Sequence, residues 1–227
     1  MEKLKTNPEK LLLLACNPKK PYWLISRQAL NMGVAGALML DLVEKEAVDF
    51  DQKKVVIKSK PDGLTVSHER VWKFINERDK SRKAKRWITA LANKATIFRK
   101  PLFDLMSQQG LLKVNHHNFL FIPYLRISVA NETARQELIA DLKKKVEGSE
   151  PLTTSEANLL SVIAAVNLLK PFVSKTSERR KFKKMVKQKV AENPVAEGIK
   201  DAIQEIQAAM TAASVAAIAG SGAASGS

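Results

Sequence analysis

The chain has 227 residues, of which 45% are hydrophobic and 27% charged, proportions that are typical of a globular protein and argue against a wholly disordered chain. Its 38 Lys and Arg residues outnumber its 23 Asp and Glu residues, and the formal net charge of +15 favours an anionic partner such as nucleic acid, anionic lipid or acidic protein. A single cysteine, Cys16, excludes an internal disulfide, so the fold has to rely on its hydrophobic core.

The sequence predicts neither export nor a membrane span. The apolar run at residues 11–15 is too short for the core of a signal peptide, and the apolar stretch at residues 208–219 is rich in alanine and interrupted by Thr211 and Ser214. A helix that crosses a bilayer needs roughly 20 strongly apolar residues. We therefore expect a cytoplasmic, soluble chain that visits a membrane surface from solution.

Hydrophobic spacing predicts that most of the chain is helical. The central helix spans residues 27–45 with Ser26 as its N-cap, and Gly33 and Gly36 within it indicate close packing against another helix. Pro101 predicts a break or restart, and Gly110 predicts the end of a helix. Further helices are predicted around residues 71–75, 87–98, 134–146, 159–166, 182–190 and 199–210, with Asn131 and the Thr153 and Glu156 capping box starting two of them.

Two short β-hairpins are predicted between the helices. The first joins residues 55–57 to 64–66 around the turn Pro61-Asp62-Gly63, and the second joins residues 111–114 to 119–122 around four turn residues, 115–118. The predicted fold class is mainly α, with one domain over residues 1–219 and one or two small hairpins. Residues 220–227 are only Gly, Ser and Ala, and we expect a disordered tail there.

No pattern in the sequence predicts catalysis. The adjacent His116 and His117 would point apart and have no carboxylate or thiol at ligand spacing, so we interpret them as solvated turn residues. Cys16 follows apolar residues and is interpreted as a core residue, and His68 has no partner at ligand spacing. We therefore expect no enzyme activity, no metal and no cofactor.

Positive charge is the distinctive chemical feature, and it falls in two segments. Residues 78–100 carry nine Lys or Arg against one Asp, and residues 175–189 carry eight against one Glu, so together they account for the whole surplus of +15. One interpretation is two solvated helix faces. The other is a surface for phosphates or anionic headgroups, because each Lys or Arg near an anionic membrane contributes on the order of 1 kcal/mol.

Ordered segments along nearly the whole chain, residues 9 to 210, resemble the Golgi phosphoprotein 3 family, which has bacterial members. They are EKLLLLACN, GVAGALMLDLV, KPDGLTVSHERVWKFI, WITAL and QQGLLKVNHHNFLFIP, followed by the helices that begin after Asn131 and Thr153. The resemblance implies a single helical domain around a central bundle, with peripheral amphipathic helices and a projecting hairpin. It further implies binding of phosphatidylinositol 4-phosphate, docking on Golgi membranes in eukaryotic members, and a grip on the cytosolic tails of membrane glycosyltransferases.

The resemblance also implies where a headgroup would bind. Aligned on Gly33 and Gly36, the Trp and Arg of the family pocket fall on Ser26 and Ala35, and its pair of arginines falls on Thr96 and Arg99. Only Arg99 matches by type. The predicted lipid-binding residues are Arg99, with Lys100 and Arg86 from the same basic segment, and Trp23 and Arg27, which lie close in sequence to the aligned Trp position.

The predicted hairpin would meet the membrane or a second copy of the chain through Phe119 and Phe121. Predicted partners are therefore an anionic phospholipid headgroup, the tails of membrane proteins and a homo-oligomer. One alternative is a winged-helix-like nucleic-acid-binding protein, because residues 101–109 and the following hairpin imitate that motif. However, residues 102–109 contain no Lys or Arg to read a groove, so nucleic acid is disfavoured. A protein-interaction scaffold without lipid specificity is the third interpretation.

Overall fold

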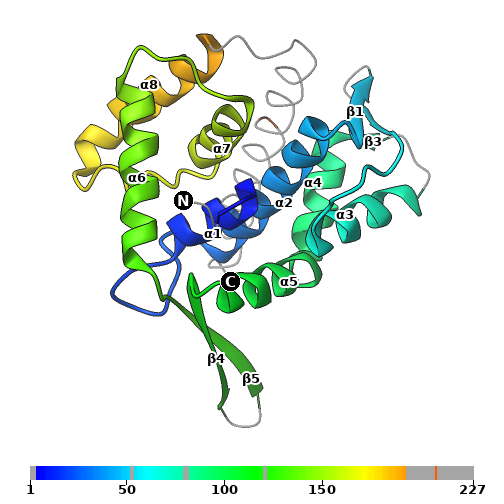
Figure 1. Cartoon of the computed structure of the whole chain (residues 1–227), viewed down its shortest axis with the longest axis horizontal. Helices are drawn as coiled ribbons and strands as arrows, with labels where there is room; N and C mark the ends of the chain where they lie inside the picture. Colours follow the sequence, from blue (N-terminus) through cyan, green and yellow to red (C-terminus); the bar gives the residue numbers. More distant parts are fainter. Residues whose placement is uncertain (1–3, 52–53, 79–81, 120–121, 193–207, 209–227) are drawn as a thin grey trace, which may run out of the picture.

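A computed structural model describes residues 4–51, 54–78, 82–119, 122–192 and 208 (Figure 1). The central helix, α2 (Arg27–Glu44), packs against α1 (Asn7–Ala15), α3 (Val66–Asn76), α4 (Ala84–Asn93) and α7 (Thr154–Ala165). Its residues from Met32 to Val43 are all buried. The predicted mainly α fold class is confirmed, and α2 is its central helix.

Local sequence signals place α2 where the hydrophobic spacing predicts it. The hydroxyl of Ser26 accepts a hydrogen bond from the backbone N–H of Ala29 at 3.1 Å, as expected of an N-cap. A Cβ atom on Gly33 would come within 2.9 Å of Leu11 Cδ2 and 3.2 Å of Val166 Cγ1. Glycine at this position therefore lets α1 and the end of α7 approach α2 closely, as the sequence predicts.

The basic segment that follows forms two helices rather than one. α4 ends at Asn93, and after Lys94 the helix α5 (Ala95–Gln108) begins, so Phe98 belongs to α5. Pro101 lies inside α5 and does not break it. Proline lacks an N–H, which leaves the carbonyl of Ile97 free in the helix, and Arg70 Nη1 donates to that oxygen at 2.9 Å. An arginine from α3 thus supplies the missing donor.

The first predicted hairpin is wrong in its pairing. β2 (Lys54–Ile57) pairs antiparallel with the preceding β1 (Val48–Asp51), and β3 (Arg82–Lys83) adds a third strand to β2. Residues 64–66 are not a strand, because Thr65 is the N-cap of α3. The turn at Gly63 is present, with a φ of 72°, but it leads into a helix.

The second predicted hairpin is present but longer than predicted. β4 (Leu112–Phe119) pairs with β5 (Ile122–Val129) over eight register pairs from Leu112↔Val129 to Phe119↔Ile122. Residues 115–118 are therefore strand, not turn, so the prediction of turn histidines is wrong. In Figure 1 this hairpin projects from the lower side of the body, beyond the end of α5.

The second half of the chain follows its capping signals. Asn131 Oδ1 accepts from Ala134 N at 2.9 Å to start α6 (Glu132–Glu147), and the Thr153 and Glu156 capping box starts α7. α8 (Thr176–Glu192) buries the predicted stripe of Phe182, Val186 and Val190 against α6 and α7. The helix predicted at residues 199–210 and the tail predicted at residues 220–227 lie outside the described residues, apart from residue 208.

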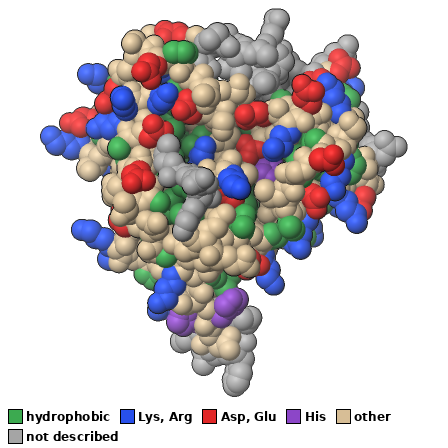
Figure 2. Space-filling view, in the orientation of Figure 1, with side chains coloured by type: hydrophobic (Ala, Val, Ile, Leu, Met, Phe, Trp, Pro, Cys, Tyr) green, Lys and Arg blue, Asp and Glu red, His purple; other side chains and the backbone are tan. Residues whose placement is uncertain are grey.

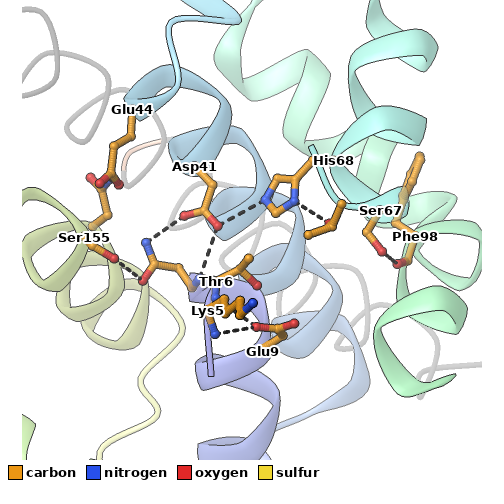
Figure 3. Close-up of polar contacts among 12 residues, drawn as sticks. Lys5, Thr6, Glu9, Asp41, Glu44, Ser67, His68, Phe98 and Ser155 are labelled. Atoms are coloured by element: carbon orange, nitrogen blue, oxygen red, sulfur yellow. Dashed lines mark hydrogen bonds and ion pairs between the residues drawn. The ribbon is translucent and has the colours of Figure 1, made fainter. Parts of the chain in front are cut away.

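A buried carboxylate on α2 links three other helices (Figure 3). Asp41 Oδ1 accepts from Asn7 Nδ2 of α1 at 2.7 Å, and Asp41 Oδ2 lies 3.1 Å from His68 Nε2 of α3. His68 is fully buried, and its Nδ1 lies 2.7 Å from the hydroxyl of Thr65. Ser155 of α7 donates to Asn7 Oδ1 at 3.2 Å. The tautomer in which His68 Nε2 donates to Asp41 and Thr65 donates to Nδ1 satisfies every group.

Replacing Asp41 with alanine should destabilise the fold by about 3–5 kcal/mol, because it leaves buried donors on Asn7 and His68 without an acceptor. The measurement is urea unfolding followed by circular dichroism. Asp104→Ala is the control, since Asp104 is an exposed acidic residue of α5 and its loss should change stability by less than about 0.5 kcal/mol. Equal unfolding midpoints for the two variants would contradict the structural role of Asp41.

Candidate functional site

Arg99 of α5 is a buried cation, and no carboxylate among the described residues pairs with it. Its side chain is only 7% exposed, and its Nε atom is buried with no hydrogen-bond partner. Its guanidinium lies over the face of the Phe103 ring, with the guanidinium carbon 5.8 Å from the ring centroid. Buried charges in proteins are normally paired or bound to a ligand. Arg99 is therefore a site where an anion would be stabilised.

The electrostatics of Arg99 reflect this isolation. Burial and, to a smaller extent, the positive charge of Arg27 together lower the pKa of its guanidinium to about 10. Both effects oppose the charged form, and no acidic group offsets them. A phosphate or carboxylate between the two arginines would reverse both effects, because it replaces lost solvation and screens their repulsion.

Trp23 reaches the same place from the loop between α1 and α2. Its ring stacks on the Phe103 ring, with centroids 6.0 Å apart and planes inclined by 19°. Phe103 therefore lies between Trp23 and Arg99 and joins the loop to α5. The three predicted residues Trp23, Arg27 and Arg99 thus come together, although they are far apart in the sequence.

The N-terminus of α2 adds to the positive potential. Arg27 is the first residue of α2, and the first turn contains no acidic residue to complement the helix dipole. A helix N-terminus with a cation on its first turn favours a negatively charged ligand. Ser26 and Ala35, which align with the family's Trp and Arg, serve here as the N-cap and as a buried residue of α2.

The other predicted site residues are placed differently. Lys100 is exposed on α5 next to Arg99, and Arg86 is exposed on a separate helix, α4. Phe119 is the last residue of β4, and its register partner is Ile122; Phe121 lies outside the described residues. Sequence reasoning did not find Phe103, because a phenylalanine inside an apolar helical stripe gives no signal that distinguishes a site from the core.

The two basic segments form separate surfaces. α8 packs on α6 and α7, whereas α4 and α5 pack on α2 and α3. Figure 2 shows Lys and Arg spread around the visible face with Asp and Glu among them. On this face the Lys and Arg side chains therefore do not form a single patch. Few of these cations are ion-paired, however. Among the described residues of both segments, one salt bridge is present, and it joins Lys175 to Glu178.

The structure explains why the other reactive side chains are not site candidates. His68 belongs to the Asp41 network, and Cys16 is buried. In the part of the chain that the structure describes, no three His, Cys, Asp or Glu side chains are placed to hold a metal ion. The helix that would read a DNA groove buries Leu102, Phe103 and Met106, so that face is committed to the core.

The family comparison agrees with this fold. The family model of Golgi phosphoprotein 3 (GPP34) matches residues 8–206, which is most of the chain. The chain belongs to the Golgi phosphoprotein 3 family. No curated protein matches it. Among the described residues, no helix of this family member is both long enough and apolar enough to span a membrane.

Cys16 should be unreactive in the folded protein, and its ionisation should lower the stability of the fold at alkaline pH. Burial raises the pKa of the Cys16 thiol to about 12, although the charge of Arg135 acts in the opposite direction. The thiol has a pKa of about 8.5 in the unfolded chain, so the folded state is favoured by keeping the thiol protonated. This contribution to the free energy of unfolding is complete below about pH 8.5 and is lost as the pH rises toward 12. Alkylation by iodoacetamide at pH 8 should follow unfolding in urea, and Cys16→Ala should reduce the loss of stability between pH 9 and 11. Rapid alkylation without urea would contradict this.

Arg99→Met should raise the stability of the free protein by roughly 1–3 kcal/mol, because it removes an unpaired buried charge and keeps the volume of the side chain. The measurement is the urea midpoint in a buffer without phosphate. Arg135→Met is the matched control: Arg135 is equally buried but is bonded to Glu132 at 3.2 Å, so its loss should not stabilise the fold. A large loss of stability in Arg99→Met would show that Arg99 serves the fold instead of a ligand.

Proposed function

We propose that this protein binds phosphorylated headgroups of anionic lipids at Arg99 and docks reversibly on membranes, without catalysing a reaction. The observation that carries the proposal is the buried Arg99, which has no acidic partner and has a second cation, Arg27, close enough to oppose its charge. The folded protein does not compensate the free-energy cost of burying this charge near a second cation. Such a cost is common at sites where a ligand supplies the missing interaction.

A phosphate is the anion that best fits these groups. A guanidinium presents a rigid fork of donors that matches the oxygens of a phosphate, and the N-terminus of α2 offers a further favourable potential. The aromatic pair of Trp23 and Phe103 beside Arg99 provides an apolar wall, which suits a headgroup that remains attached to its glycerol and acyl chains.

A membrane source for the phosphate is favoured over a soluble one. The resemblance to the family implies a phosphatidylinositol 4-phosphate-like headgroup, and the surplus of +15 adds attraction to any anionic surface. Exposed cations such as Lys100 and Arg86 would contribute to this general attraction. The cytosolic tails of membrane proteins are a second partner that the family suggests, but no contact in the described structure points to them.

The test is sedimentation with vesicles of phosphatidylcholine alone, with added phosphatidylserine, or with added phosphatidylinositol 4-phosphate, at two salt concentrations. Arg99→Ala should weaken binding to vesicles with phosphatidylinositol 4-phosphate at least tenfold, since hydrogen bonds to charged groups are worth about 1.5–3 kcal/mol. Arg99→Lys should be intermediate, because it keeps the charge but loses the fork. Binding to phosphatidylserine should fall steeply with salt.

Lys181→Ala with Lys184→Ala is the matched control, because it removes two exposed charges on α8, away from the site. This double substitution should weaken binding to phosphatidylserine vesicles and to phosphatidylinositol 4-phosphate vesicles by the same factor. That factor should be smaller than the effect of Arg99→Ala on phosphatidylinositol 4-phosphate vesicles. Competition by soluble inositol phosphate would measure how much of the affinity belongs to the headgroup alone. Equal binding of wild type and Arg99→Ala to vesicles with phosphatidylinositol 4-phosphate would overturn the proposed site, and tight binding of duplex DNA with no vesicle binding would overturn the function.

A further inference from the structure

The loop between α1 and α2 exposes five consecutive residues beside the Arg99 site. These residues, 18–22, form the loop tip and read Pro-Lys-Lys-Pro-Tyr. Tyr22 is 51% exposed and is one of the few large hydrophobic side chains that the described structure leaves in solvent. Lys19 and Lys20 are exposed next to it. Neither the core nor the Arg99 site accounts for this cluster.

The backbone of the loop tip is closed on itself. Asn17 Oδ1 accepts hydrogen bonds from the N–H groups of Lys19 at 2.9 Å and Lys20 at 3.2 Å, and Tyr22 N donates to Lys20 O at 2.8 Å. Asn17 N donates to Tyr22 O at 3.0 Å, and positions 18 and 21 are prolines, which have no N–H. Every backbone donor from residue 17 to residue 22 is therefore either bonded within the loop or absent.

This closure matters for the environment that the loop can enter. An unbonded backbone N–H costs several kcal/mol in a region that water does not reach, so loops with free N–H groups remain outside the hydrocarbon region of a bilayer. A loop whose donors are already satisfied avoids that cost. The two prolines also restrict the loop before binding, so less conformational freedom is lost when it is held against a surface.

The side chains of the loop tip have the chemistry of a bilayer interface. Tyrosine is enriched at the level of the headgroups, because its ring is apolar and its hydroxyl stays hydrated. Lysines beside it extend their ammonium groups toward anionic phosphates while their methylene chains lie along apolar surface. A segment with this composition fits an anionic membrane surface better than a protein groove or a nucleic-acid base.

The loop tip is also fixed relative to Arg99. Leu24 N donates to Ala15 O at 2.8 Å, and Cys16 pairs with Trp23 in a β-bridge that closes the base of the loop. Trp23 in turn stacks on Phe103, which contacts Arg99. Figure 1 shows the segment between α1 and α2, in blue at the lower left, on the same lower side of the body as α5 and the β4–β5 hairpin.

We propose that residues 18–22 form a membrane anchor, in which Tyr22 enters the boundary between headgroups and acyl chains and Lys19 and Lys20 contact lipid phosphates while Arg99 holds one headgroup. This inference rests on the proposed function, since it names how the same site meets its membrane. It places a contact with the acyl region in the α1–α2 loop, in addition to the contact predicted for the hairpin.

The direct test is fluorescence of single-tryptophan additions on vesicles that contain brominated lipids. Tyr22→Trp should gain emission that is shifted to shorter wavelength and quenched by lipids brominated near the headgroup. Val66→Trp is the control, because Val66 is similarly exposed but lies at the start of α3. Leu125→Trp reports on the hairpin, where Leu125 is exposed on β5. Quenching of the residue 125 reporter without quenching of the residue 22 reporter would overturn the proposal.

A second measurement separates this inference from the proposed function. Tyr22→Ala should weaken binding to anionic vesicles about fivefold, and Lys19→Ala with Lys20→Ala about thirtyfold, since each group contributes about 1 kcal/mol. If wild type binds and Arg99→Ala does not, but Tyr22→Ala binds like wild type and the residue 22 reporter is not quenched, the anchor is refuted and the headgroup site stands. If the reporter is quenched and Arg99→Ala binds normally, the anchor stands and the headgroup site is refuted. No binding by wild type would refute both.

Discussion

The carboxylate of Asp41 is the constraint from which the geometry of the site follows. It lies on a helix that is otherwise apolar on nearly every side, so its oxygens have to be satisfied by other elements, and only particular positions of α1 and α3 do so. His68 is bonded to this carboxylate, and the next residue toward the N-terminus, Ser67, donates to the carbonyl of Phe98 at 2.9 Å. The residue after Phe98 is Arg99. Two polar contacts, at His68 and at Ser67, and the peptide bond after Phe98 therefore fix the backbone of Arg99 relative to the central helix.

This arrangement explains how a small helical protein can hold an unpaired cation in place. A flexible arginine would turn toward solvent and recover its hydration. Arg99 is prevented from doing so because the neighbouring Phe98 packs against Phe74 of α3, with ring centroids 5.7 Å apart, while Phe103 and Trp23 lie on its other side. In the proposed function, the core gives up some stability at this position in exchange for a preformed site for an anion. A binding site of this kind needs no catalytic group.

The sequence predicted those parts of the fold that local signals determine. Ser26, Asn131 and Thr153 each begin a helix where their side chains predict it, because a cap acts within three residues of itself. Strand pairing depends on distant residues, and both hairpin predictions failed in detail for that reason. Thr65 is a residue type that favours strands, but here it is the N-cap of α3. The polar residues 115–118 resemble a turn, but they pair with residues 123–126 as strand. The candidate site was predicted in part: Arg99 came from the family pattern, while the role of Phe103 depends on tertiary packing alone.

If the protein docks on a membrane as proposed, the separation of the two basic segments sets its orientation there. α8 lies at the top of Figure 1, and the α1–α2 loop, α5 and the β4–β5 hairpin lie at the bottom. A flat anionic surface that met Arg99 and Tyr22 would therefore leave α8 on the side of the molecule away from the lipid. On α8, Lys183 is partly buried, and burial and then the charge of Lys187 lower its pKa, so the helix carries repulsion that contact with this membrane would not relieve. In the proposed function, the cations of α8 add only to the general attraction during approach to an anionic surface, whereas the specific contact would depend on Arg99 and the loop beside it.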